Sequence, residues 1–379
     1  YRAPSLYQFL VILVLSSIIT GSLLTGKSVR TSLRGTNIER LNGTQYTISA
    51  GDRYFPLSLS ERMEKKTGGG IEGILETTGW ASNLKTGISA LDIQVHGIND
   101  SFFTFGSPVN NLHLEKGEAV INSNLARKLE IVKGEDIILR FPEISEIPLE
   151  APFNPEEDTY SSLVLTVKEI LDTEGPASFS LGINQARPLN VFLPLEEFST
   201  FFDDSLKINR ILAHTGLSMT AKETEDILNS EFTPGDAGFS TRQSATTAMI
   251  EILSERIFIS DRELADITEA LPGSAPLLTY LVNELSLEGE STPYSFISAL
   301  PKKLFDQTPG ANNIIINTWL ADDLDAGPGD SLSVSYYTVG PYKKLTEKRH
   351  VFVVSDITGM RSELSDSLLM PPFPGISGR

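Results

Sequence analysis

The stretch Ala119-Val-Ile-Asn-Ser-Asn-Leu-Ala-Arg-Lys-Leu129 decides how this chain of 379 residues folds, because it occurs twice. The second copy, Ile314-Ile-Ile-Asn-Thr-Trp-Leu-Ala-Asp-Asp-Leu324, aligns with the first without a gap, 195 positions further along the chain. A sequence that repeats itself at a fixed offset indicates a repeated structural unit. We therefore expect one small fold, called the cassette below, to be built twice.

Each copy of the cassette has the pattern of a strand, a short helix, a turn and a second strand. A β-branched run predicts the first strand, and Asn122 or Asn317 then stands where a helix N-cap accepts a backbone N–H. Leucines follow four positions apart, on one helical face. Gly134 and Gly329 are expected to adopt the left-handed conformation that ends the helix and turns the chain. The predicted closing strands are 163–170 and 351–357.

An uncharged apolar run opens the chain. Between Arg2 and Lys27 lie 24 residues without a charge, most of them large and apolar. About 20 such residues in a helix cross the ~30 Å hydrocarbon core of a bilayer, and a helix satisfies its own backbone groups there. A signal peptide would have a shorter apolar region, about 7–15 residues, behind a basic segment. The run therefore favours a transmembrane helix.

The end of this run also matches a nucleotide-binding motif. Gly21-Ser-Leu-Leu-Thr-Gly-Lys-Ser28 fits the G-x-x-x-x-G-K-[ST] pattern of a P-loop, in which backbone N–H groups surround the phosphates. A P-loop follows a short buried strand of about 5–6 residues. The apolar run before Gly21 is much longer and begins without a turn signal. A membrane-tethered P-loop NTPase is therefore the less favoured reading of this segment.

The composition excludes several classes of function. With 31 Lys and Arg against 49 Asp and Glu, the net charge of −18 argues against nucleic-acid binding. The absence of cysteine excludes disulfides, thiolate metal sites and cysteine nucleophiles. The four histidines are scattered, and the aspartates of the second cassette lack calcium-loop spacing. No catalytic, cofactor-binding or metal-binding residue is predicted, and we expect no enzymatic activity.

Several short segments resemble one family of membrane proteins. Residues 24–34, which leave the apolar run, resemble the first membrane segment and stalk of FtsX-like ABC transporter permeases. The Ile-Asn-x-x-Leu-Ala-x-x-Leu core of the cassette, with its Gly-Asp turn, resembles their MacB-like periplasmic core domain. Lys27 departs from the family pattern, which has an acidic residue at this position. Further short matches follow in the order expected of a large-domain subgroup, at 190–195, 278–283, 293–295 and 373–376.

The resemblance and the patterns together predict an α+β protein with several subdomains, because the chain is longer than one hydrophobic core usually organises. The expected divisions are a transmembrane helix at 1–28, a stalk and the first part of the periplasmic domain at 29–115, the first cassette at 116–175, a central α+β subdomain at 176–309, the second cassette at 310–360, and a tail at 361–379 that leads toward a C-terminal membrane part.

The resemblance implies the N-terminal part of an ABC transporter permease subunit in the bacterial inner membrane, with a large domain in the periplasm. Its partners would be a separate cytoplasmic ABC ATPase and a second permease subunit, in a homo- or heterodimer. ATP-driven motion would reach the periplasmic domain through a stalk in which Val29, Leu33 and Ile38 have roughly helical spacing. A membrane-anchored periplasmic binding or scaffold protein without transport is the alternative. The sequence does not identify a cargo.

Overall fold

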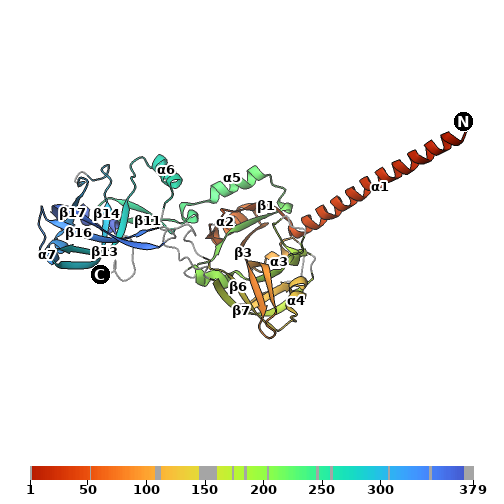
Figure 1. Cartoon of the computed structure of the whole chain (residues 1–379), viewed down its shortest axis with the longest axis horizontal. Coiled ribbons are helices and arrows are strands. Elements are labelled where there is room, and N and C mark those ends of the chain that lie inside the picture. Colours follow the sequence, from red (N-terminus) through yellow and green to blue (C-terminus); the bar gives the residue numbers. More distant parts are fainter. Residues whose placement is uncertain are drawn as a thin grey trace. The chain divides into compact units, whose positions relative to one another are not determined.

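The chain folds into two compact units. The computed structural model describes residues 2–51, 53–106, 112–144, 160–172, 175–182, 186–202, 205–244, 247–256, 259–305, 308–340 and 344–370. The first unit comprises residues 1–145 with 158–236, and the second comprises 146–157 with 237–379 (Figure 1). The boundary divides the stretch 176–309, expected as one central subdomain, because strands near its start complete the sheet of the first unit.

Helices lie between single strands and pairs of strands along the first unit. In chain order they are α1 (Arg2–Arg40), β1 (Thr44–Ile48), β2 (Phe55–Pro56), α2 (Leu57–Thr67), β3 (Ile71–Asn83), β4 (Ser89–Ile98), α3 (Phe102–Phe105), β5 (Glu118–Asn122), α4 (Ser123–Leu129), β6 (Asp136–Pro142), β7 (Tyr160–Leu171), η1 (Gly175–Ser178), β8 (Asn190–Pro194), η2 (Leu195–Phe201), β9 (Lys207–Ile208), β10 (Arg210–His214), η3 (Thr215–Leu217), α5 (Ala221–Glu231) and η4 (Pro234–Ala237), where η marks a 3₁₀ helix.

The main sheet of the first unit closes on itself. Its strand order is β1-β10-β3-β4-β8-β5-β7-β6, and β6 also pairs with β3. The six strands β3-β4-β8-β5-β7-β6 therefore form a closed barrel. At the closure, a Cβ on Gly79 would lie 2.2 Å from the carbonyl oxygen of Arg140. Only glycine permits this approach of two backbones. Closure leaves no free edge in the barrel, while β10 and β1 extend the sheet beside β3.

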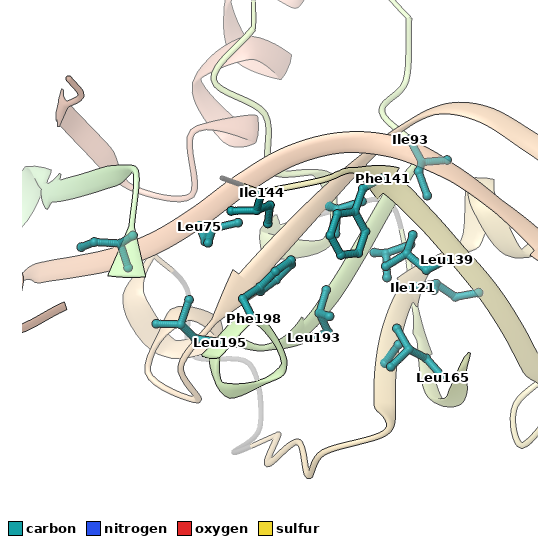
Figure 2. Close-up of a cluster of buried hydrophobic side chains, with 14 of the residues drawn as sticks. Leu75, Ile93, Ile121, Leu139, Phe141, Ile144, Leu165, Leu193, Leu195 and Phe198 are labelled. Atoms are coloured by element: carbon teal, nitrogen blue, oxygen red, sulfur yellow. The ribbon is translucent and has the colours of Figure 1, made fainter. Parts of the chain in front are cut away.

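Alternation along the strands produces one core inside the barrel and another layer outside it. Ile121 belongs to the inner cluster, whereas its neighbour Val120 belongs to the outer one. Figure 2 shows inner side chains from several strands, among them Ile93, Leu139 and Leu193, in one cluster. Successive residues of a strand point to opposite faces. The outer layer is built on aromatic side chains and lies beside the C-terminal end of α1.

The second unit contains a mixed five-stranded sheet of order β14-β13-β16-β17-β15 and a small hairpin, β11-β12. Within the sheet, β15 runs parallel to β17 and the other pairs are antiparallel. Its elements are β11 (Phe239–Gln243), β12 (Ile250–Ser254), α6 (Asp261–Ala270), β13 (Leu278–Leu287), β14 (Glu290–Ala299), β15 (Asn313–Asn317), α7 (Thr318–Leu324), β16 (Ser331–Val339), β17 (Leu345–Thr358), η6 (Glu363–Ser365) and η7 (Ser367–Leu369).

The two cassettes have the same fold, as the repeated sequence predicts. The Asn122 side chain accepts a hydrogen bond from Leu125 N–H at 3.0 Å, and Asn317 accepts one from Leu320 N–H at 2.8 Å. In each copy the first strand is parallel to the closing strand, and the register shifts after the second pair. The apolar face of each helix is buried. Most of the Pro-rich loop 142–158 of the first cassette lies outside the described residues.

The helix ends differ from the prediction. α4 and α7 end at Glu130 and Asp325, which adopt the left-handed conformation at φ 50° and 48°. Gly134 and Gly329 lie four residues later and also have positive φ, 88° and 102°. Their N–H groups donate to carbonyl oxygens of the closing strands, at 2.8 and 2.7 Å. The glycines therefore turn the chain into the next strand, whereas the helix has already ended.

A single helix, α1, carries the apolar run and continues beyond it (Figure 1, red). Among the described residues, one helix, Pro4–Arg40, is long and apolar enough to cross a membrane. At about 1.5 Å per residue, the 39 residues of α1 extend roughly 58 Å. The predicted change from transmembrane helix to stalk near residue 28 therefore falls within one unbroken helix.

Candidate functional site at the base of the stalk helix

The C-terminal end of α1 is fixed to the first unit by backbone hydrogen bonds. The Arg40 carbonyl oxygen accepts a hydrogen bond from Ser180 N–H at 3.0 Å, and the Gly43 carbonyl oxygen accepts one from Thr215 N–H at 2.8 Å. Arg40 is only 7 % exposed and Thr44 only 5 %. We call residues 40–44 the stalk junction. The helix is exposed along most of its length, yet its last residue, Arg40, is buried.

Two glycines allow the backbones at the stalk junction to approach each other. A Cβ on Gly106 would lie 2.0 Å from the carbonyl oxygen of Asn42, which no side chain permits. A Cβ on Gly43 would lie 2.6 Å from Nε2 of His214, and Gly43 has φ +75°. A positive φ and a close backbone contact both favour glycine. Glycine at these two positions therefore allows the segment after α1 to pack closely against the residues beside α3.

Asn42 is buried in the stalk junction and connects it to α3. It adopts φ 47°, is 3 % exposed, and donates a hydrogen bond from Nδ2 to the carbonyl oxygen of Phe102 at 3.2 Å. Asn42-Gly-Thr44 also matches the pattern of a glycosylation acceptor. A buried amide that bonds α3 is not available as an acceptor, so in the folded unit this asparagine is structural.

An aromatic layer lies behind the stalk junction. The Phe102 ring is 5.1 Å from Phe179 and 5.6 Å from Phe192, centroid to centroid. The His96 ring stacks on Phe192 at 5.1 Å and is fully buried. Burial lowers the pKa of His96 to about 3, against a smaller opposing effect of Asn190, so the imidazole is neutral at physiological pH. The layer is therefore uncharged at His96.

Glu72 is an acidic residue on the outer face of β3. It pairs with Leu212 across β3 and β10, and it is 5 % exposed. Burial raises the pKa of Glu72 to about 7; hydrogen bonds from Ser101 and Asn99 oppose this rise, and the charge of Glu64 adds to it. A carboxyl group with a pKa of about 7 changes its charge near neutral pH. Because Glu72 interacts with residues just before α3, this face is sensitive to pH.

A groove runs along α1 above the stalk junction. Its volume is about 540 Å³, and Leu181 and its neighbours form the wall opposite the helix. The lining residues are Gly26, Val29, Arg30, Leu33, Arg34, Asn37, Ile38, Arg40, Leu41, Ser180, Leu181 and Gly182. The three residues predicted for the moving stalk, Val29, Leu33 and Ile38, all lie in it. The lining combines apolar side chains with arginines and contains no acidic residue.

The apparent P-loop is helical. Gly21–Ser28 lies inside α1, where the backbone N–H groups are held by helix hydrogen bonds. The Thr25 hydroxyl donates to the Gly21 carbonyl oxygen at 2.9 Å, as side chains do within a helix. No loop is formed that could surround a phosphate. The segment has the geometry of a membrane or stalk helix.

Two aspartates of the second cassette, Asp323 and Asp330, have structural partners. The Gly327 N–H donates to the Asp330 carboxylate at 2.7 Å, and the Thr292 hydroxyl donates to Asp323. Within the described residues, no group of three or more metal-ligating side chains is assembled. These acids therefore fix the turn and hold α7 against β14.

The residues that make the stalk junction were not selected by any functional pattern. The pair Asn42-Gly43 after a long helix is the signal of a helix end in the left-handed conformation, and it would have located the last turn. Gly106 and Ser180 give no local signal. Their roles depend on contacts with residues more than 60 positions away in the chain.

The solved structures similar to this chain include two extracytoplasmic domains. The periplasmic region of MacB from Actinobacillus actinomycetemcomitans is 11% identical over 63% of this chain and 99% of that one, with a TM-score of 0.31. The extracellular domain of the noncanonic ABC-type transporter YknZ from Gram-positive bacteria is 10% identical over 57% of this chain and 94% of that one, with a TM-score of 0.27. No protein-family model matches the chain, and no curated protein matches its sequence.

Proposed function

We propose that this chain is a permease subunit of an ABC transporter, of the FtsX-like type with a MacB-like periplasmic domain. The observation that carries the proposal is the unbroken passage of α1 from the apolar run into the buried stalk junction. A helix fixed at its end by hydrogen bonds and close backbone contacts moves together with the barrel it enters. The doubled cassette and the sequence resemblance around it support the same assignment.

The proposed mechanism is mechanical. A cytoplasmic ABC ATPase would supply the energy, and the displacement of α1 would be passed to the first unit through residues 40–44. Transmission of this kind requires an element that can adopt two arrangements. The ATPase and the periplasmic domain must each shift the equilibrium between them. The exposed side chains of the upper stalk, Val29 at 53 % and Leu33 at 45 %, provide a surface for a second permease subunit. This chain itself contributes no ATP chemistry in the proposal, since Gly21–Ser28 is helical.

The first test combines membrane extraction with isolation of partners. The full chain should stay in the membrane fraction after alkaline carbonate washing, and an ABC ATPase should co-purify with it from native membranes. A chain that carbonate releases would contradict the proposal. A chain that is integral but never accompanied by an ATPase would instead support a membrane-anchored scaffold.

A second test addresses transmission through the stalk. Val29→Asp combined with Leu33→Asp should weaken the dependence of ATP hydrolysis on the assembled permease, because two charges enter the surface proposed to meet the partner subunit. Leu84→Asp with Val132→Asp is the matched control, since these residues are also exposed, 51 % and 62 %, but belong neither to α1 nor to the groove lining. Equal ATPase coupling in both double variants would contradict a role of the stalk.

A further inference from the structure

The groove along α1 begins where the apolar run ends. Lys27 is the first charge after the 24 uncharged residues, and Arg30 and Arg34 follow at three- and four-residue spacing. Such spacing places the three cations on one side of a helix. From Lys27 to Arg34 the helix rises roughly 10 Å, comparable with the polar headgroup layer that separates the ~30 Å hydrocarbon core from water.

Within the described residues, Arg30 and Arg34 of the groove have no internal counter-charge. The lining residues include Arg30, Arg34 and Arg40 but neither aspartate nor glutamate. In the described part of the chain, no carboxylate forms an ion pair with Arg30 or Arg34. This concentration of positive charge stands in a chain whose net charge is −18. An anionic ligand is therefore the complementary occupant.

The remaining lining is apolar and accessible. Val29 and Ile38 are 53 % and 57 % exposed on α1, and Leu181 faces the helix from a segment about 140 positions later in the chain. Exposed apolar surface beside unpaired cations suits a molecule with an anionic head and a hydrocarbon tail. Arginine also binds phosphate oxygens through two parallel hydrogen bonds.

We infer that this groove binds an anionic phospholipid from the leaflet nearest the first unit. Its phosphate pairs with Arg30 and Arg34, and its apolar part next to the headgroup lies against Leu181 on the opposite wall. The inference rests on the proposed function to the extent that α1 must cross the membrane. A bound lipid at this height ties the stalk to the membrane surface just above the stalk junction.

Native mass spectrometry of the full chain, released from micelles with phosphatidylglycerol or phosphatidylcholine, tests the inference. Phosphatidylglycerol should remain bound and phosphatidylcholine should not. Arg30→Gln with Arg34→Gln should weaken phosphatidylglycerol binding by about tenfold, or about 1.4 kcal/mol. Lys65→Gln with Lys222→Gln removes the same charge from exposed positions of α2 and α5 and should leave binding unchanged.

A second pair of variants separates a groove from general charge attraction. Leu181→Ser alters the opposite wall without touching the arginines and should also release the lipid, whereas Leu91→Ser, at a residue 62 % exposed on β4, should not. Equal retention of both lipids, or retention by the double-arginine variant, would overturn the inference. If the chain resists carbonate and co-purifies with an ATPase but binds no lipid, only this inference fails and the proposed function stands.

Discussion

Gly106 and Asn42 approach so closely that a Cβ on Gly106 would lie 2.0 Å from the Asn42 carbonyl oxygen. The contact joins the segment after α3 to the turn that follows the stalk helix, 64 positions earlier in the chain. It is one of the contacts that hold the end of α1 against the rest of the first unit. A single methyl group is therefore enough to test whether the stalk and the barrel move as one body.

Gly106→Ala should loosen the stalk junction. The added methyl group must displace backbone atoms, and overpacking of this kind costs about 1–3 kcal/mol. The sequence contains no cysteine, so spin labels at one engineered cysteine in α1 and one in β7 report the distance between helix and barrel. The distance distribution should broaden in Gly106→Ala. Gly35→Ala, on α1 with nothing within 4 Å of the added atom, is the control; identical distributions in both variants would show that the contact does not hold the helix.

Glu72→Gln should remove a dependence of stability on pH. The pKa of Glu72 rises from 4.5 to about 7 on folding, so the protonated side chain favours the folded state. This contribution to the free energy of unfolding is complete below pH 4.5 and is lost as pH rises toward 7. Across this window the wild-type free energy of unfolding should fall relative to Glu72→Gln, by at most about 1.4 kcal/mol per pH unit. Denaturation of the full chain in micelles, followed by Trp80 fluorescence in a Trp319→Phe background, measures it. Parallel pH profiles would contradict the assignment.

The two cassette asparagines should differ in their importance. Asn122→Ala and Asn317→Ala each remove an N-cap worth about 1 kcal/mol. Asn122 is fully buried and also donates to the carbonyl oxygens of Ala177 and Pro188, at 3.3 and 2.9 Å. Asn122→Ala should therefore cost about 1–3 kcal/mol more, since buried acceptors lose their partner. Trp80 and Trp319 fluorescence report the two units separately, and equal losses would contradict the extra role of Asn122.

Arg62 should stabilise the end of the first unit more than Lys66 does. Arg62 donates to the Asp236 carboxylate at 2.6 Å and to the Glu231 carbonyl oxygen, and the Asp236 side chain is only 3 % exposed. Arg62→Gln should cost about 1.5–3 kcal/mol. The pair of Lys66 with Glu231 is more exposed, so Lys66→Gln should cost less than about 1 kcal/mol. Hydrogen exchange in α5 measures both, and the reverse order would refute this account.

Sequence patterns located much of the secondary structure because its causes are local. The Asn caps, the leucine pairs and the β-branched runs act within one cassette, and the structure reproduces them in both copies. The predicted helix ends at Gly134 and Gly329 were wrong by four residues. Non-glycine residues, Glu130 and Asp325, accept the left-handed conformation there, and a glycine pattern does not reveal this.

The sequence by itself determined the repeated cassette, the apolar helix and the absence of cysteine, because composition and short-range spacing carry that information. Only the tertiary structure decided that β6 returns to β3 to close a barrel, that the unit boundary falls at residue 236, and that Asn42, Gly106 and Ser180 meet at the end of α1. These features are contacts between residues far apart in the chain. Their energies depend on burial and backbone approach, which no local pattern encodes.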